Sequence, residues 1–184
     1  MASASPSAGV PISGSDGDKL GGKSLYGVLM PTVRFADPED APAILALQKR
    51  AFEPEARLYG DWKIPPLCEV LEELIEQMRL GKVLKAVEGA EIVGSVRGRL
   101  DGEVCLIGRL VVEPARQGQG IGSALLGAVE EAFPEVEAFE LFTGSGSADN
   151  LRLYRRKGYE PVGTRVLSPR VSLVVLRKAN VLKA

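Results

Sequence analysis

The sequence contains no histidine among its 184 residues. This absence excludes Ser-His-Asp and Cys-His nucleophilic sites, imidazole general bases and most zinc sites. We therefore expect no metal, and any proton transfer must use a carboxylate, tyrosine, lysine, cysteine or water. Cysteine is also scarce: Cys68 and Cys105 lack metal-type spacing, which is typical of reduced thiols in a cytosolic protein. We accordingly expect a cytoplasmic location.

Long apolar runs and an excess of one charge are missing as well. No apolar segment approaches the roughly 18 residues that a membrane-spanning helix needs. The 23 basic and 24 acidic residues leave a formal charge of −1, so the chain as a whole lacks the basic surface of a nucleic-acid-binding protein. We expect neither a membrane nor a nucleic acid as partner. The sequence does not determine the oligomeric state, and a homodimer stays open.

The first 29 residues differ in composition from the rest. They are rich in Ser, Ala, Gly, Pro and Asp, and they bury too little apolar surface to offset the entropy of ordering. They also lack the basic start and apolar stretch of a secretory signal. We interpret residues 1–29 as a flexible leader, which cloning could have added, and residues 30–184 as a single domain.

The remaining sequence predicts alternating helices and strands. A strand at 32–35 precedes a helix capped by Asp37, and a loop over 53–66 leads to a second helix from about Val70. Three strand-like runs joined by tight turns then predict an antiparallel meander. Those runs are 82–87, 91–99 and 103–112; they are followed by a helix at 122–133, a strand at 138–143, a helix at 148–157 and strands at 161–166 and 171–177.

A glycine-rich segment lies between the third strand of the meander and the next helix. Residues 117–123 read Gln-Gly-Gln-Gly-Ile-Gly-Ser. Glycines let the backbone bend sharply and approach a ligand, and the free N–H groups of a first helical turn favour a phosphate or pyrophosphate. A purely structural turn is one alternative. A dinucleotide-binding motif is another, although Ser123 replaces its third glycine and residues 113–116 separate it from the strand.

The segment from Leu110 to Pro114, followed by Gln117-x-x-Gly120-x-Gly122, resembles the cofactor-binding motif of the GNAT superfamily of N-acetyltransferases. The resemblance covers about residues 32–177. It implies an α/β fold with a mixed, mostly antiparallel twisted sheet of six or seven strands and about four helices on both faces. It also implies acetyl-CoA as co-substrate. Its pyrophosphate would be held by Gln117, Gly118, Gln119, Gly120, Ile121, Gly122 and Ser123, and its pantetheine arm by backbone groups of Leu110, Val111 and Val112 on a splayed strand.

A second segment, Leu153-Tyr154 followed by Gly158-Tyr159, is similar to the other signature of that family. The resemblance implies that Tyr154 is the general acid at the leaving thiolate, and that Asn150 lies near the cofactor. A phenol with a pKa of about 10 stays protonated at neutral pH and can donate. The alternative is that Tyr154 only packs its ring, and Tyr159 is expected in the core. The nearby basic cluster has two interpretations, a solvated helix face or a contact with the cofactor: Arg152, Arg155, Arg156 and Lys157.

The acceptor side is less defined by the sequence. An attacking amine must lose a proton, yet the strand before the glycine segment carries no carboxylate at 107–109. We expect the loop at 52–62 to form the acceptor wall, where Glu53, Glu55 and Asp61 would attract a cationic amine; Glu140 is a further candidate. Cys105 is expected in the core. The expected function is acetyl-CoA-dependent acetylation of a primary amine, on a small molecule or peptide, by direct attack; a non-catalytic acyl-CoA-binding module is the alternative.

Overall fold

The computed structural model describes residues 31–181, so the predicted leader at 1–29 lies outside the described residues. The elements follow in this order: β1 (Thr32–Phe35), the 3-10 helix η1 (Pro38–Asp40), α1 (Ala41–Tyr59), α2 (Pro65–Cys68), α3 (Leu71–Leu80), β2 (Lys82–Glu88), β3 (Glu91–Asp101), β4 (Val104–Val112), the 3-10 helix η2 (Pro114–Arg116), α4 (Ile121–Glu131), β5 (Ala138–Gly144), α5 (Ala148–Arg156), β6 (Glu160–Ser168) and β7 (Val171–Ala179).

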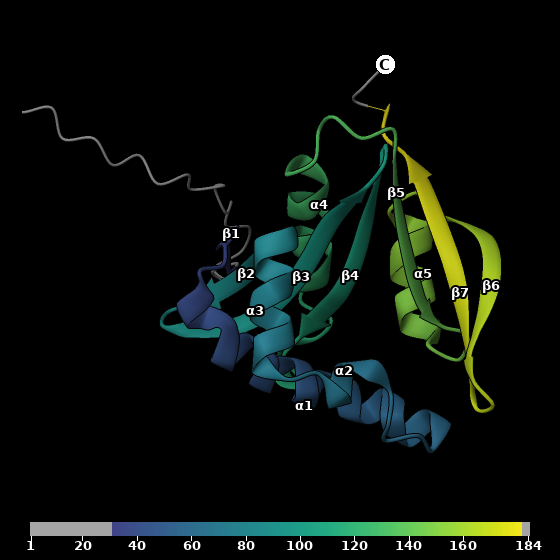
Figure 1. Cartoon of the computed structure of the whole chain (residues 1–184), viewed down its shortest axis with the longest axis horizontal. Coiled ribbons are helices and arrows are strands. Elements are labelled where there is room, and N and C mark those ends of the chain that lie inside the picture. Colours follow the sequence, from purple (N-terminus) through teal and green to yellow (C-terminus); the bar gives the residue numbers. More distant parts are fainter. Residues whose placement is uncertain (1–30, 182–184) are drawn as a thin grey trace, which may run out of the picture.

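The strands form one seven-stranded sheet in the order β1-β2-β3-β4-β5-β7-β6. Every neighbouring pair is antiparallel except β4 and β5, which are parallel. In Figure 1, α3 lies in front of the sheet and α4 behind it, with α1 and α2 across the lower edge of the view. The expected mixed, mostly antiparallel α/β sheet is confirmed, with five α-helices in the described chain in place of about four.

Alternation along the strands explains why both faces carry helices. On β2, Leu84 and Ala86 are buried in the core cluster that includes Leu125 of α4. Val83, one residue away, is buried on the opposite face with residues of α1 and α3, including Leu74. Successive strand side chains point to opposite faces of the sheet. A strand whose odd and even positions are both apolar therefore needs a helical layer on each face.

The first helix is longer than the sequence indicates. We predicted a loop over residues 53–66, and its first part was wrong. Proline lacks the N–H that a helix interior uses, yet Pro54 lies inside the helix. Helix α1 continues through Pro54 to Tyr59 and ends at Gly60, whose φ of 60° is left-handed. Ala56 is fully buried in a cluster with Val171 and other residues, so tertiary packing holds the last turns despite the missing donor.

The second predicted helix is confirmed, although it starts one residue later than expected. Val70 is its N-cap and is 48% exposed, and the helical face starts with Leu71. None of the helices within residues 31–181 is long and apolar enough to cross a membrane.

Candidate active site

Strands β4 and β5 part halfway along their length. They are paired only from Val104 opposite Ala138 to Ile107 opposite Leu141, although β4 runs on to Val112. Beyond that point the two strands leave their facing backbone groups unpaired with each other. The splayed strand that the family resemblance implied is therefore present.

A bulge in β4 lies where the strands part. Ser95 of β3 is opposite Val111 and Arg97 is opposite Gly108, so β4 carries one more residue than β3 over this stretch. Arg109, in the bulge, has a φ of 52° and is the one non-glycine residue of the described chain with a positive φ. A bulge bends its strand and increases the local twist, which turns the end of β4 away from β5.

The glycine-rich segment follows β4 and opens α4. Gly118 has a φ of 77°, and Gly120, the N-cap of α4, has a φ of 85°. Both lie in the left-handed region that favours glycine. The first turn of a helix leaves its N–H groups without intrahelical partners, and here they point out of the N-terminus of α4. The side-chain Nε2 of Gln117 donates to the carbonyl of Val112 at 3.4 Å, which ties the segment to the end of β4.

These features border a cleft of about 820 Å³. It runs along the end of β4, the start of α4 and the start of α5. Of the residues that the family resemblance assigned to the cofactor, Gln119 is not among those that line the cleft. The others all line it: Leu110, Val111, Val112, Gln117, Gly118, Gly120, Ile121, Gly122, Ser123 and Asn150.

Three arginines add positive charge to the cleft. Arg152 and Arg156 line it from α5, and Arg116 lines it from η2. Arg116 was not singled out from the sequence, although it directly precedes the glycine segment; its Nη2 lies 2.6 Å from a carboxylate oxygen of Glu88. Arg155 and Lys157, the rest of the predicted basic cluster, are not part of the lining. Arg152 is paired with Asp149, which also lines the cleft. Arg116 and Arg156, together with the N-terminus of α4, suit an anionic ligand.

The last turns of α1 form one wall of the cleft. Glu55 lines it, and the Ser147 hydroxyl donates to Glu55 Oε1 at 3.0 Å. The backbone N–H of Gly146 donates to the Tyr59 hydroxyl at 2.7 Å. A helix therefore occupies the position expected for a loop. Within the predicted wall at 52–62, Trp62 is 54% exposed and Asp61 accepts a hydrogen bond from Ser168, and neither residue lines the cleft.

Tyr154 lies in the core beside this wall. It is 6% exposed, packs edge-on against Tyr159 at a centroid distance of 6.1 Å, and is not part of the cleft lining. Burial raises the pKa of the Tyr154 phenol above its usual value, and the negative charge of Glu55 raises it further. The phenol is therefore protonated at neutral pH, as a proton donor must be, while its role stays a prediction.

Two other residues of the second segment, Asn150 and Tyr159, hydrogen-bond to neighbouring elements. Asn150 donates from Nδ2 to the Thr143 hydroxyl at 3.3 Å, which links the start of α5 to the end of β5. Tyr159 is fully buried and its hydroxyl donates to Glu130 at 2.7 Å, as expected of a core residue.

The remaining candidates lie away from the cleft. Cys105 is fully buried, and burial raises the pKa of its thiol to about 12, so it is a core residue. Glu140 on β5 lies 3.6 Å from Arg165 and does not line the cleft. Within residues 31–181, no three His, Cys, Asp or Glu side chains converge as metal ligands would.

Comparison with known proteins agrees with this geometry. Residues 42–159 match the sequence model of the acetyltransferase (GNAT) family. Ribosomal-protein-S18-alanine N-acetyltransferase from Escherichia coli shares the fold with a TM-score of 0.67 and 16% identity, over 82% of this chain and 94% of that one. Ribosomal-protein-alanine N-acetyltransferase from Brucella melitensis shares the fold with a TM-score of 0.64 and 22% identity, over 80% of this chain and 98% of that one.

A third structure, the PaiA N-acetyltransferase from Thermoplasma acidophilum in complex with coenzyme A, gives a TM-score of 0.66 at 13% identity, over 80% of this chain and 97% of that one. No curated protein sequence matches the chain significantly. The dinucleotide-binding alternative fails because β3 and β4, which lead into the glycine segment, are antiparallel. The family model, the splayed strands and the glycine-rich helix start agree, and the chain belongs to the GNAT family of acetyltransferases.

Proposed function

We propose that this chain transfers an acetyl group from acetyl-CoA to a primary amine by direct attack. The observation that carries the proposal is the continuity of one cleft from the N-terminus of α4 to the exposed end of β4. The N-terminus of α4 would hold the pyrophosphate, and the exposed end of β4 would hold the pantetheine arm. The complex of PaiA with coenzyme A supports the choice of cofactor.

The residues present fit such a ligand. Gly118 faces open space, because a Cβ atom there would meet no other atom of the protein within 4 Å. Without a side chain, its backbone can come close to a ligand in that space. Arg116 and Arg156 supply cations for the phosphates. Leu110 and Leu153 supply apolar surface for the arm. Bound coenzyme would bring the reactive thioester; the protein would hold it beside the amine, and such positioning accounts for much of the rate in reactions of this kind.

We include Tyr154 as the donor of a proton to the departing thiolate. It follows the cleft-lining Leu153 in sequence, and its phenol is close enough to Glu55, another lining residue, for that charge to raise the phenol pKa. In this scheme the amine nitrogen bonds to the acetyl carbonyl carbon, the carbon–sulfur bond breaks, and the phenolic proton passes to sulfur. The amine's own proton leaves to solvent or to a carboxylate, and a proton from solvent restores the Tyr154 phenol before the next turnover.

The test is the release of free coenzyme A thiol from acetyl-CoA in the presence of a panel of amines, for the wild type and Tyr154→Phe. We expect the substitution to lower kcat by about 100-fold or more while the coenzyme A-induced rise in Tm is kept. Tyr159→Phe is the matched control, because it removes a buried hydroxyl that bonds Glu130 outside the cleft; its turnover should stay within about threefold of the wild type.

A non-catalytic acyl-CoA-binding module is the second candidate. The observation in its favour is that Tyr154 is absent from the cleft lining. This candidate predicts a coenzyme A-dependent rise in Tm but no thiol release with any amine. Turnover that is equal in the wild type and Tyr154→Phe would keep acetyl transfer and reject Tyr154 as the donor.

A further inference from the structure

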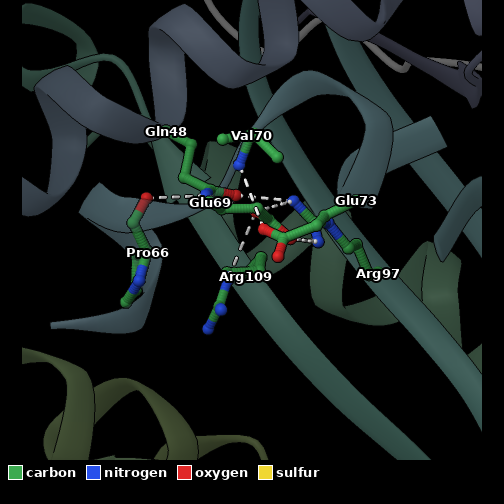
Figure 2. A network of polar contacts seen from close by, with 7 residues as sticks. All are labelled: Gln48, Pro66, Glu69, Val70, Glu73, Arg97 and Arg109. Carbon is green, nitrogen blue, oxygen red and sulfur yellow. Dashed lines mark hydrogen bonds and ion pairs between the residues drawn. The ribbon is translucent and has the colours of Figure 1, made fainter. Parts of the chain in front are cut away.

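A buried polar network lies on the face of β3 and β4 that α1 covers (Figure 2). Glu69, between α2 and α3, is 7% exposed. Arg97 donates to both of its carboxylate oxygens, at 2.7 and 2.8 Å. Gln48 donates from Nε2 to Glu69 Oε2 at 2.6 Å and accepts from Arg97 at 2.7 Å. Arg97 and Gln48 therefore satisfy the carboxylate.

Arg109 is the surplus member of this network. Its Nε lies 3.8 Å from Glu69 Oε2, an ion-pair distance that is too long for a hydrogen bond. Two guanidinium groups thus share one carboxylate, which leaves one positive charge in excess. Burial lowers the pKa of Arg109; the charge of Glu69 opposes that change and the charge of Arg97 adds to it. The site holds a cation that its own residues do not fully neutralise.

Unpartnered polar atoms gather at the same place. In the described part of the chain, three buried side-chain atoms have no hydrogen-bond partner: Ser95 Oγ, Arg97 Nε and Arg109 Nε. Ser95 and Arg97 are two apart on β3 and so share a face. Arg109 reaches Glu69 on that same face. Folded proteins leave few buried polar groups unpaired, so these three atoms mark the bulge as a polar part of the fold that its own residues do not fully satisfy.

The position of Arg109 connects this cluster to the reaction. It lies in the bulge at which β4 leaves β5; Arg109 does not itself line the cofactor cleft, but the next residue, Leu110, does. Its side chain is 23% exposed, and in Figure 2 its guanidinium end is directed away from Glu69. Beside it, Gly108 faces open space, since a Cβ atom there would meet nothing within 4 Å. Space and an unneutralised cation therefore adjoin the point where the strands part.

We propose that Arg109 binds a carboxylate of the acceptor, so that the amine acetylated by this protein also carries a carboxylate near its amino group. This inference rests on the proposed acetyl transfer. A guanidinium presents planar, parallel N–H donors that match a carboxylate, and Arg97 already holds its partner in this way. The left-handed backbone of Arg109 costs conformational energy, and the orientation it gives the side chain in the bulge accounts for a non-glycine residue there.

The experiment compares Arg109→Gln with the wild type on matched acceptors: free amino acids against their carboxamides, and Asp-initiated dipeptides against Asn-initiated ones. The first pair places the carboxylate on the α-carbon and the second places it on a side chain. The pair that responds therefore shows which of the two carboxylate positions Arg109 binds. We expect KM for the carboxylated member of one pair to rise roughly 10- to 100-fold, with KM for acetyl-CoA unchanged. Arg99→Gln, which removes an exposed arginine of β3, should change neither the KM for the acceptor nor the KM for acetyl-CoA.

Thermal shift supplies a readout that does not need turnover. With coenzyme A present, the preferred carboxylated amine should raise the Tm of the wild type but not that of Arg109→Gln, and the Tm of the ligand-free variant should not fall, because Arg97 and Gln48 still hold Glu69. An equal rise in KM for carboxylated and amidated amines, or a raised KM for acetyl-CoA, would overturn the inference. If no amine releases thiol, acetyl transfer fails as the function, and the thermal shift alone then decides whether Arg109 binds a carboxylate.

Discussion

Replacing Arg97 with methionine tests whether the network on β3 holds the fold. The substitution keeps a long unbranched side chain but removes both hydrogen bonds to Glu69. Glu69 would then be a carboxylate 7% exposed, held by Gln48 at 2.6 Å and with Arg109 at 3.8 Å. Breaking one side of a buried ion pair costs about 3 to 5 kcal/mol. We expect the lower end, because Arg109 partly compensates for the missing charge.

Proton uptake by Glu69 limits this cost and makes it depend on pH. In the wild type the pKa of Glu69 is below its ordinary value of 4.5, because the hydrogen bonds from Arg97 and Gln48 outweigh the opposing effect of burial. Its stabilising contribution is thus present above pH 4.5 and is lost as pH falls through the folded pKa. Without Arg97, burial dominates and the folded pKa rises above 4.5, so the variant loses stability as pH rises. Protonating a carboxyl of pKa 4.5 costs about 3.4 kcal/mol at pH 7 and about 0.7 at pH 5.

Urea unfolding of the wild type and Arg97→Met at pH 5 and pH 7 measures the effect. We expect a loss of about 3 kcal/mol at pH 7, equivalent to a fall in Tm of roughly 6 to 12 °C, and a loss smaller by about 2 kcal/mol at pH 5. Arg99→Met, on the same strand but exposed, should stay within about 0.5 kcal/mol of the wild type at both pH values. A loss below about 1 kcal/mol at pH 7, or a loss of equal size at both pH values, would refute the assignment of a buried, ionised Glu69.

Two further predictions concern the thiols and the glycines of α4. Cys68 is exposed, whereas Cys105 is buried with a pKa near 12, so a thiol reagent at pH 8 should modify one cysteine in the native protein and two in denaturant; two rapid reactions in the native protein would contradict the burial. Gly120→Ala places a side chain at a φ of 85°, and should cost about 1 to 2 kcal/mol in urea unfolding and weaken coenzyme A binding. Gly127→Ala, inside α4 with nothing within 4 Å of its Cβ position, should instead stabilise the fold by about 0.5 to 1 kcal/mol without affecting binding. If both variants changed the unfolding free energy in the same direction, the left-handed backbone of Gly120 would not be the cause of its effect.

The strands and the glycine-rich helix start could be predicted because their signals are local. Alternating apolar residues and tight turns predict a meander, and the glycines at 118 and 120 have the left-handed φ values that a close-approach loop needs. The family motif then assigned the cofactor residues, of which Gln119 alone is not in the cleft lining. The error on α1 has the opposite origin. Pro54 is a local helix-breaking signal, but the burial of Ala56 against β7 is a long-range contact that overrides it.

The sequence by itself determined the fold class, the glycine-rich start of α4 and the exclusion of histidine chemistry, since each depends on residue identity or on spacing within a few turns. Only the tertiary structure decided that the last turns of α1, with Glu55, wall the cleft, and that Arg97 and Arg109 meet Glu69. Those contacts join residues 28 and more apart in the chain. The physical reason is that a one-residue bulge in β4 determines which side of the sheet Arg109 faces, and no local pattern encodes that bulge.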